Sequence, residues 1–410
     1  MADHTKTDGG FAWLMVGVAF AMQTLAFGGI GAVGVFLKPL VAEFGWSRGD
    51  TAAGYSMVAL SAAAFGIFWG WLADRKGGRN IAVFGVAMMG ISYFALSYTG
   101  SLWYYYLLHF AFGALGNSAV GTPLFATVGY WFTRNQGLAI GLMAAGGAFG
   151  QAVVPFAARL LISAYDWQTA YMWIGIAFLA IGLPLAMLLR DPPSRAILAP
   201  GAVRAAPAVA EVPPPVAPSV SIPFISAGSY FCCICMSVPI VHTVALVSDR
   251  GFDPEQAAGV LAALMIAGIA GRILGGKLAD MIGPVPGWMV ASFGQTALVF
   301  AFPFVDSLLL TYLLAIVFGV FYSADMSSIL VTTRMLIPAK MAASAMGVVV
   351  FFGWLGMGTG AWLGGYIFDV TGSYTQSYAV AAAGGIVNLV ILALFRMRLN
   401  RSTPVGLATA

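Results

Sequence analysis

One short motif occurs twice in this sequence, once in each half of the chain. Gly70–Arg79 reads GWLADRKGGR, and Gly275–Gly283 reads GGKLADMIG. Each copy follows a long apolar segment and places an Asp four residues after a Gly. The Gly lets two helices approach closely, and the Asp can cap a helix N-terminus, where the helix dipole favours an anion. We therefore expect two related halves with the same loop at the same place. The residues expected to build the two loops are Gly70, Asp74, Arg75, Arg79, Gly276 and Asp280.

Composition places both halves in a membrane. Of the 410 residues, 60% are hydrophobic and 8% are charged, whereas about 25% of a soluble domain is charged. Apolar runs of about 20 residues, long enough to cross a ~30 Å hydrocarbon core, recur along the chain. The net charge of +4 comes from loop Lys and Arg residues and does not indicate nucleic-acid binding. The sequence predicts an all-α membrane protein that has the lipid bilayer as its partner.

The apolar runs predict twelve spans, six on each side of a central linker. The linker, 191–221, is rich in Pro and Ala and cannot pack a core. It separates an N-terminal bundle (1–190) from a C-terminal bundle (222–410). The spans are expected at roughly 11–37, 50–73, 80–99, 103–132, 136–162, 167–190, 222–248, 254–279, 284–305, 308–333, 340–367 and 376–396.

The distribution of basic residues predicts the orientation of the chain. Of the 19 Lys and Arg residues, fourteen lie in the N-terminus, the C-terminus and the loops that follow even-numbered spans. Four lie in the other loops, and Arg272 lies inside a span, which accounts for all 19. Because cytoplasmic loops carry the excess of Lys and Arg, both termini are expected in the cytoplasm. The expected location is the cell membrane, which for a bacterial chain is the inner membrane.

The repeated loop resembles the signature loop of the major facilitator superfamily. Two copies, six spans apart and separated by a long linker, are far more specific than one. The resemblance implies the major facilitator fold, with twelve transmembrane helices in two six-helix bundles that move around a site near the membrane midplane.

Three further stretches resemble the monocarboxylate transporter family. DGGFAW, Asp8–Trp13, stands at the start of the first span, and GYWFTRNQGLAIGLMAAGGAFG, Gly129–Gly150, leads into the fifth. GGYIFDVTGSY, Gly364–Tyr374, ends the eleventh span and looks like bacterial members of that family. The resemblance covers both halves. It implies transport of small carboxylates such as lactate or pyruvate, often together with a proton.

Arg272 is a permanent cation inside an apolar span. It lies eight residues from Asp280, or about 12 Å along a helix. A buried Arg is costly in lipid but can act in a wet cavity, where its planar fork binds a carboxylate through two hydrogen bonds. Gly268, Gly275 and Gly276 are expected to leave room beside it. The family resemblance puts its substrate-binding arginine at this position. The alternative is a structural role, in which Arg272 pairs with Asp325 or with helix carbonyls.

Asp325 is the acidic residue expected deep inside a span. It lies about 13–14 Å from Arg334, at a depth similar to that of Arg272. Tyr322, one turn earlier, belongs to the same polar stripe. Burial raises the pKa of a carboxyl and a nearby Arg lowers it, so a balanced group can carry a proton. Asp325 is predicted either to couple proton and substrate or to be a static partner of Arg272.

The sequence departs from the family at two positions linked to proton coupling. Animal members carry a Lys where this chain has Gly31 and an Asp where it has Gly268. The chain therefore needs another coupling group, Asp325 or His242, or it exchanges anions without a proton. His242 is predicted to face the cavity, with a structural role as the alternative.

Two further side chains are candidates for the substrate site. Asn117 is predicted to donate hydrogen bonds to the substrate or to clasp two helices. Phe351 is predicted to wall the cavity or to pack. The candidate substrate-binding residues are Arg272, Asn117, His242, Tyr322 and Phe351.

The leading prediction is a monomeric, proton-coupled secondary transporter of small monocarboxylates that works by alternating access. No cofactor or nucleotide motif occurs in a credible context, so we expect neither a cofactor nor enzymatic activity. One alternative is an oxalate/formate-type exchanger of carboxylates. A second cation in the cavity would favour dicarboxylates, and the sequence offers none. A membrane sensor is the alternative outside transport, and a sensor usually has a long soluble extension.

Overall fold

In the computed structural model, the regular elements of the described residues are all helices. The structure describes 9–121, 124, 131, 136–190 and 216–402. The helices are α1 (Gly10–Phe44), α2 (Arg48–Lys76), α3 (Gly78–Leu96), α4 (Leu102–Ala111), η1 (Phe112–Asn117), α6 (Gln136–Ala164), α7 (Trp167–Leu188), α8 (Pro218–Asp249), α9 (Pro254–Ile282), α10 (Pro284–Val299), η3 (Phe302–Phe304), α11 (Leu308–Leu336), α12 (Ala339–Thr371) and α13 (Tyr374–Ser402).

Eleven helices in the described part of the chain are long and apolar enough to cross a membrane. The twelfth expected span, 103–132, begins as α4, continues through η1 and stays helical to Gly121. Its remainder lies outside the described residues, apart from 124 and 131. The prediction of an all-α, multi-pass membrane protein is confirmed. Several helices extend beyond their expected spans. For example, α1 continues to Phe44, and α8 begins at Pro218, inside the stretch expected to be linker.

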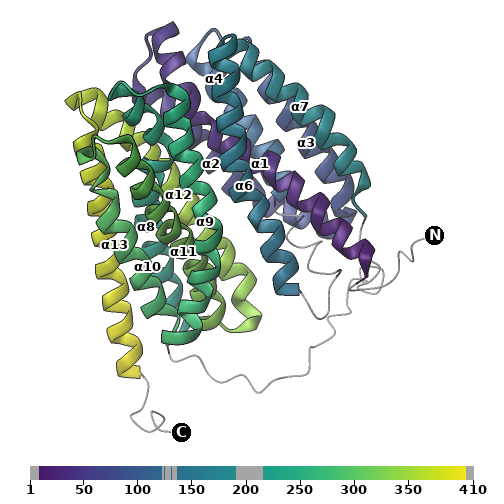
Figure 1. Ribbon diagram of the computed structural model, residues 1–410. Coiled ribbons are helices and arrows are strands. Elements are labelled where there is room, and N and C mark those ends of the chain that lie inside the picture. Colours follow the sequence, from purple (N-terminus) through teal and green to yellow (C-terminus); the bar gives the residue numbers. More distant parts are fainter. Residues whose placement is uncertain (1–8, 122–123, 125–130, 132–135, 191–215, 403–410) are drawn as a thin grey trace.

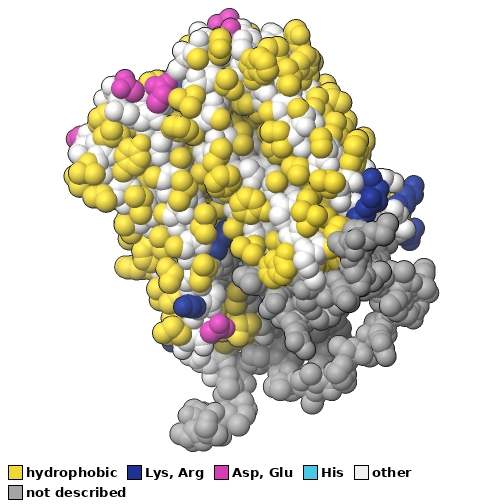
Figure 2. Space-filling view, turned by 45° about the vertical axis from the view of Figure 1, so that its right-hand side comes forward, with side chains coloured by type: hydrophobic (Ala, Val, Ile, Leu, Met, Phe, Trp, Pro, Cys, Tyr) yellow, Lys and Arg dark blue, Asp and Glu magenta, His cyan; other side chains and the backbone are white. Residues whose placement is uncertain are grey.

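The helices form two groups. Figure 1 shows α1–α7 on one side of the molecule and α8–α13 on the other. The side that holds the start of α1 and the end of α13 is called the linker face, and the other end of the helices the opposite face. Figure 2 shows a surface that is mostly hydrophobic, with most charged side chains toward its ends, as contact with lipid requires.

The repeated loop has the same backbone conformation in both halves. Gly77 joins α2 to α3 with φ 92° and ψ 151°, and Gly283 joins α9 to α10 with φ 90° and ψ 158°. A side chain is strained at such positive φ values, whereas Gly is not. Each glycine lies three residues after the Asp of its motif copy. The internal repeat read from the sequence is thus also a structural repeat.

Glycines let pairs of helices pack backbone against backbone. A Cβ on Gly146 or Gly150 of α6 would collide with the carbonyl oxygens of Phe20 or Thr24 in α1. A Cβ on Gly271 of α9 would collide with the Val320 carbonyl of α11 in the same way. Small residues at such crossings give the close van der Waals packing that holds membrane helices together.

We predict that Gly271→Ala lowers the thermal stability of the protein in detergent by several degrees. The added methyl has no space, so α9 and α11 must separate, and overpacking of this kind costs about 1–3 kcal/mol. Gly347→Ala is the matched control, because no described atom outside its own stretch of α12 lies within 4 Å of the added Cβ. Equal melting temperatures for the two variants would contradict the close packing of α9 and α11.

Candidate substrate site

Arg272 reaches from one helical group to the other. Its helix, α9, belongs to the second group, and its Nη1 donates a hydrogen bond of 3.3 Å to the Ala144 carbonyl of α6 in the first. The Nε atom of Arg272 is buried and has no hydrogen-bond partner in the described structure. A guanidinium has five N–H donors, so most of its capacity is free to bind an anion.

Asp325 lies in a different environment from Arg272. It is fully buried inside the second helical group. Its carboxylate accepts hydrogen bonds from Ser292 Oγ of α10, at 2.9 and 3.0 Å, and from Cys232 Sγ of α8, at 3.0 Å. Asn388 of α13 donates to the same Ser292 hydroxyl at 2.7 Å. Among the described residues, Asp325 and Arg272 form no ion pair, so the predicted static pairing is not present in this conformation.

Two of the three glycines near Arg272, Gly268 and Gly275, do not leave the expected space, whereas Gly276 does. The position of a Cβ on Gly268 is occupied by the Ser323 hydroxyl, and that on Gly275 by the Ala324 carbonyl, both of α11. Gly276, which was expected to allow a close helix contact, has no described atom within 4 Å of its Cβ position. The correction follows from helix rotation, because Gly268, Gly271 and Gly275 share the face that packs on α11.

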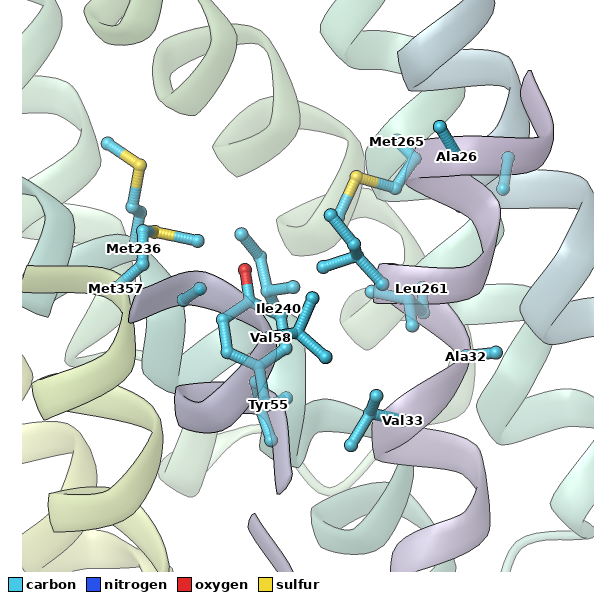
Figure 3. Packing of buried hydrophobic residues seen from close by; sticks show 14 of the residues in the cluster. Ala26, Ala32, Val33, Tyr55, Val58, Met236, Ile240, Leu261, Met265 and Met357 are labelled. Atoms are coloured by element: carbon cyan, nitrogen blue, oxygen red, sulfur yellow. The ribbon is translucent and has the colours of Figure 1, made fainter. Parts of the chain in front are cut away.

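Apolar side chains from both groups meet in the middle of the molecule. Figure 3 shows Tyr55 and Val58 of α2 near Met236 and Ile240 of α8 and Met357 of α12. These five side chains are buried. This region, which we call the apolar wall, is a buried apolar contact between the two groups.

Tyr322 belongs to α11, the helix that packs against α9, which carries Arg272. It is 5% exposed. Its ring stacks on Phe318 of the same helix, with ring centroids 6.4 Å apart. The predicted role of Tyr322 in the substrate site stays a prediction. Sequence reasoning missed Tyr55, which has no charged neighbour in the sequence to distinguish it from a packing residue.

Phe351 lies on the face of α12 that turns toward the first helical group. Trp354 and Gly358 follow it at i+3 and i+7 and share that face. Trp354 packs on Phe27 of α1 with ring centroids 6.4 Å apart, and the Cβ position of Gly358 is 3.4 Å from Ser56 Cα of α2. Nearer the linker face, Phe351 is 37% exposed. This position agrees with a cavity wall, although no contact with Arg272 is seen.

Asn117 is the last residue of a π-helical turn, η1. It is 5% exposed, and its Nδ2 has no hydrogen-bond partner in the described structure. Isolated π-helical turns are frequent at functional sites. The helix-clasp alternative requires a partner for the Asn117 amide donor, and the described residues supply none.

His242 is buried in a hydrogen-bonded chain that leads to the opposite face. Its Nε2 lies 2.8 Å from the Ala361 carbonyl, which makes Nε2 the protonated nitrogen. Its Nδ1 therefore accepts, at 3.4 Å, from the Tyr374 hydroxyl. That hydroxyl accepts a hydrogen bond of 3.0 Å from Arg48 Nη1. His242 faces α12 and α13 and not an open cavity in this conformation.

Four charged residues join the two groups at the opposite face, and we call them the ionic latch: Lys38, Arg48, Asp249 and Asp369. Asp249 at the end of α8 pairs with Lys38 Nζ at 2.8 Å and with both terminal nitrogens of Arg48. Asp369 of α12 accepts from the backbone N–H groups of Arg48 and Gly49 at 2.8 and 2.7 Å, at the N-terminus of α2. The latch holds the two groups together at the opposite face.

Gly364–Tyr374, the stretch that resembles the monocarboxylate transporter family, makes many of the contacts at the opposite face. A Cβ on Gly364 would collide with the His242 ring, and one on Gly365 with the backbone of Gly49. Asp369 belongs to the ionic latch. The Tyr374 hydroxyl donates to His242 Nδ1 and accepts from Arg48 Nη1, so it links these two residues. Sequence reasoning identified this stretch as a signature without assigning roles to its residues.

The motif loops lie at the linker face, away from Arg272. The Arg75 guanidinium stacks over the Trp71 ring at 4.1 Å from its centroid. Gly70 and Arg79 are partly buried and Asp280 is exposed. The Asp74 side chain lies outside the described residues. The predicted gating role of these loops stays a prediction.

Two groups of long apolar helices, with a buried and unpaired guanidinium nitrogen where they meet, are the arrangement expected of a membrane transporter. The model of the Major Facilitator Superfamily matches 19–309 and 224–409. The chain therefore belongs to the major facilitator superfamily, as its repeated loop indicated. Its family and relatives are transporters, which confirms that the chain is not an enzyme.

The relatives include monocarboxylate transporters. The chain is 28% identical to monocarboxylate transporter 13 of Bos taurus over 92% of this chain and 87% of that one. It is 27% identical to the 3-(3-hydroxy-phenyl)propionate transporter of Escherichia coli K12 over 95% and 94% of the two chains. A bacterial homolog of the lysosomal transporter Spinster, in an inward-facing conformation, shares the fold with a TM-score of 0.74 at 16% identity, over 96% of this chain and 97% of that chain.

Proposed function

We propose that this protein is a secondary active transporter of small monocarboxylates, of the size of lactate or pyruvate. The observation that carries the proposal is the Arg272 guanidinium, which stands between the two helical groups with a buried, unpaired Nε. A carboxylate would supply the missing acceptors through a charge-assisted, bidentate contact. The apolar wall around Tyr55 would hold the hydrocarbon part. Relatives with names that specify monocarboxylate and phenylpropionate transport support this substrate class.

Transport is proposed to work by alternating access. The ionic latch holds the opposite face closed, so its breakage is the step that would open the site to that side. Arg159 of α6 and Glu255 of α9 add a second ion pair of 3.6 Å between the groups at the same face. From the excess of Lys and Arg in the linker-side segments, we infer that the linker face and both termini are cytoplasmic. A single chain carries the whole proposed site, which favours a monomer.

Transport is proposed to be coupled to a proton, with Asp325 and His242 as the candidate carriers. The contacts favour His242. Asp325 is surrounded by Ser292 and Cys232 within one helical group, so its protonation state does not change contacts between the groups. The His242 Nδ1, in contrast, accepts from Tyr374, which in turn accepts from Arg48 of the ionic latch. A proton on Nδ1 would remove this acceptor and place a second positive charge near Arg48.

Uptake by purified protein in proteoliposomes tests the function. We expect an inward proton gradient to drive accumulation of labelled lactate or pyruvate, with little response to membrane potential, because a proton and a monoanion move as a neutral pair. Oxalate should compete poorly, since the proposed site has a single cation, Arg272, for its two carboxylates. Rapid oxalate–formate exchange without pH-driven accumulation would instead identify a carboxylate exchanger. The absence of any carboxylate flux from folded protein would contradict the proposal.

A further inference from the structure

A buried glutamine of α1 has no hydrogen-bond partner. Gln23 is 0% exposed, and among the described residues neither its Oε1 nor its Nε2 is hydrogen-bonded. Buried polar groups in native proteins are almost always paired, and each exception calls for an explanation. One such explanation is that a bound ligand supplies the missing hydrogen-bond partner. The Asn117 amide nitrogen is also buried without a hydrogen-bond partner among the described residues.

Gln23 lies on the face of α1 that meets the second helical group. Phe27 and Gly34, at i+4 and i+11, share this face. Phe27 packs on Trp354 of α12, and a Cβ on Gly34 would meet the Val241 carbonyl of α8 at 2.5 Å. Gln23 therefore points toward the region between the two groups and not toward lipid.

Gln23 and Asn117 belong to the same small region. Gly121 lies one helical turn after Asn117 and so on the same helix face. The Gly121 Cβ position is 3.9 Å from Gln23 Oε1. A larger residue at this place would fill the space that the two amides border. The π-helical turn that ends at Asn117 changes the local rotation of the helix, as such turns do at functional sites.

The same region lies at the level of Arg272. Thr24, the neighbour of Gln23, donates a hydrogen bond of 3.1 Å to the Gly146 carbonyl of α6. Ala144, two residues earlier in α6, accepts from Arg272. One short stretch of α6 thus contacts both α1 next to Gln23 and the arginine. The Arg272 guanidinium and the amides of Gln23 and Asn117 therefore lie at a similar depth, beside the space between the two helical groups.

We propose that Gln23 and Asn117 form a polar subsite that binds a hydroxyl or oxo group of the substrate while Arg272 binds its carboxylate. An amide offers both a donor and an acceptor, which a hydroxyl can satisfy together. The subsite makes the transporter selective for hydroxy and oxo acids over acids that lack the second polar group. This inference rests on the proposed carboxylate transport and names its specificity.

The test compares matched acids in proteoliposomes. The pairs are L-lactate with propionate, and 3-(3-hydroxyphenyl)propionate with 3-phenylpropionate. In at least one pair, we expect wild-type protein to take up the hydroxylated acid about tenfold faster or more than its partner. Without the substrate hydroxyl, the buried amides of Gln23 and Asn117 stay unpaired. Gln23→Leu, or the shape-preserving Gln23→Met, should remove this preference and retain uptake of the acid without the hydroxyl.

Ser118→Ala is the matched control, because Ser118 is buried next to Asn117 but donates to the Ala114 carbonyl of its own helix at 2.7 Å. It should keep the wild-type preference. An unchanged preference in both folded Gln23 variants, or equal wild-type uptake within both pairs, would overturn the subsite and leave carboxylate transport standing. If wild-type protein transports no member of either pair, the proposed function fails and the subsite with it.

Discussion

Arg272→Gln should abolish carboxylate uptake, and Arg272→Lys should reduce it by about tenfold to a hundredfold. Glutamine removes the charge. Lysine keeps it but loses the planar fork that binds both carboxylate oxygens, and hydrogen bonds to charged groups are worth about 1.5–3 kcal/mol each. Folding should survive, because the one hydrogen bond of Arg272 among the described residues is a long one, to the Ala144 carbonyl. The measurement is the initial uptake rate of labelled pyruvate in proteoliposomes.

Arg396→Lys on α13 controls for a general effect of losing a guanidinium. Arg396 is exposed and borders a groove between α10 and α13 on the outer surface of the second group. Its replacement should leave uptake unchanged. Wild-type uptake by a folded Arg272→Lys or Arg272→Gln variant would remove Arg272 from the substrate site and with it the main support for the proposed function.

His242→Gln should abolish pH-driven accumulation while exchange of internal for external substrate continues. Glutamine can still donate to the Ala361 carbonyl, as His242 Nε2 does at 2.8 Å, but it cannot take up a proton. Asp325→Asn should retain both activities, because an amide can keep a hydrogen bond to Ser292 and no contact between the groups depends on the charge. Accumulation against a pH gradient and counterflow exchange, measured on the same vesicles, separate the two carriers.

His109→Gln is the matched control for the loss of a buried histidine. His109 of α4 is also buried, but its Nδ1 is 2.9 Å from the Tyr105 carbonyl of its own helix, and among the described residues it forms no hydrogen bond with the second group. Its replacement should leave accumulation intact. The reverse pattern, with accumulation lost in Asp325→Asn and kept in His242→Gln, would assign the coupling proton to Asp325.

Local sequence determined the membrane class, the helical fold and the two related halves. A span needs about 20 apolar residues. Whether a segment meets this condition can be decided from that segment alone, without knowledge of its neighbours in the fold. The repeated loop could be recognised because its glycines must adopt a positive φ, as Gly77 and Gly283 do. The depth of Arg272 also followed from local counting, since each helical residue rises 1.5 Å.

The tertiary structure alone decided which polar groups meet. Arg272 and Asp325 were expected at similar depths, yet Arg272 contacts α6 while Asp325 contacts Ser292 and Cys232. Depth follows from the distance to the helix end, but direction depends on how each helix is rotated against its neighbours. Successive residues differ by about 100° around a helix, so a small rotation moves a side chain from one neighbour to another. Packing, through contacts such as Gly271 against Val320, fixes that rotation and left Gln23 facing the space between the two groups.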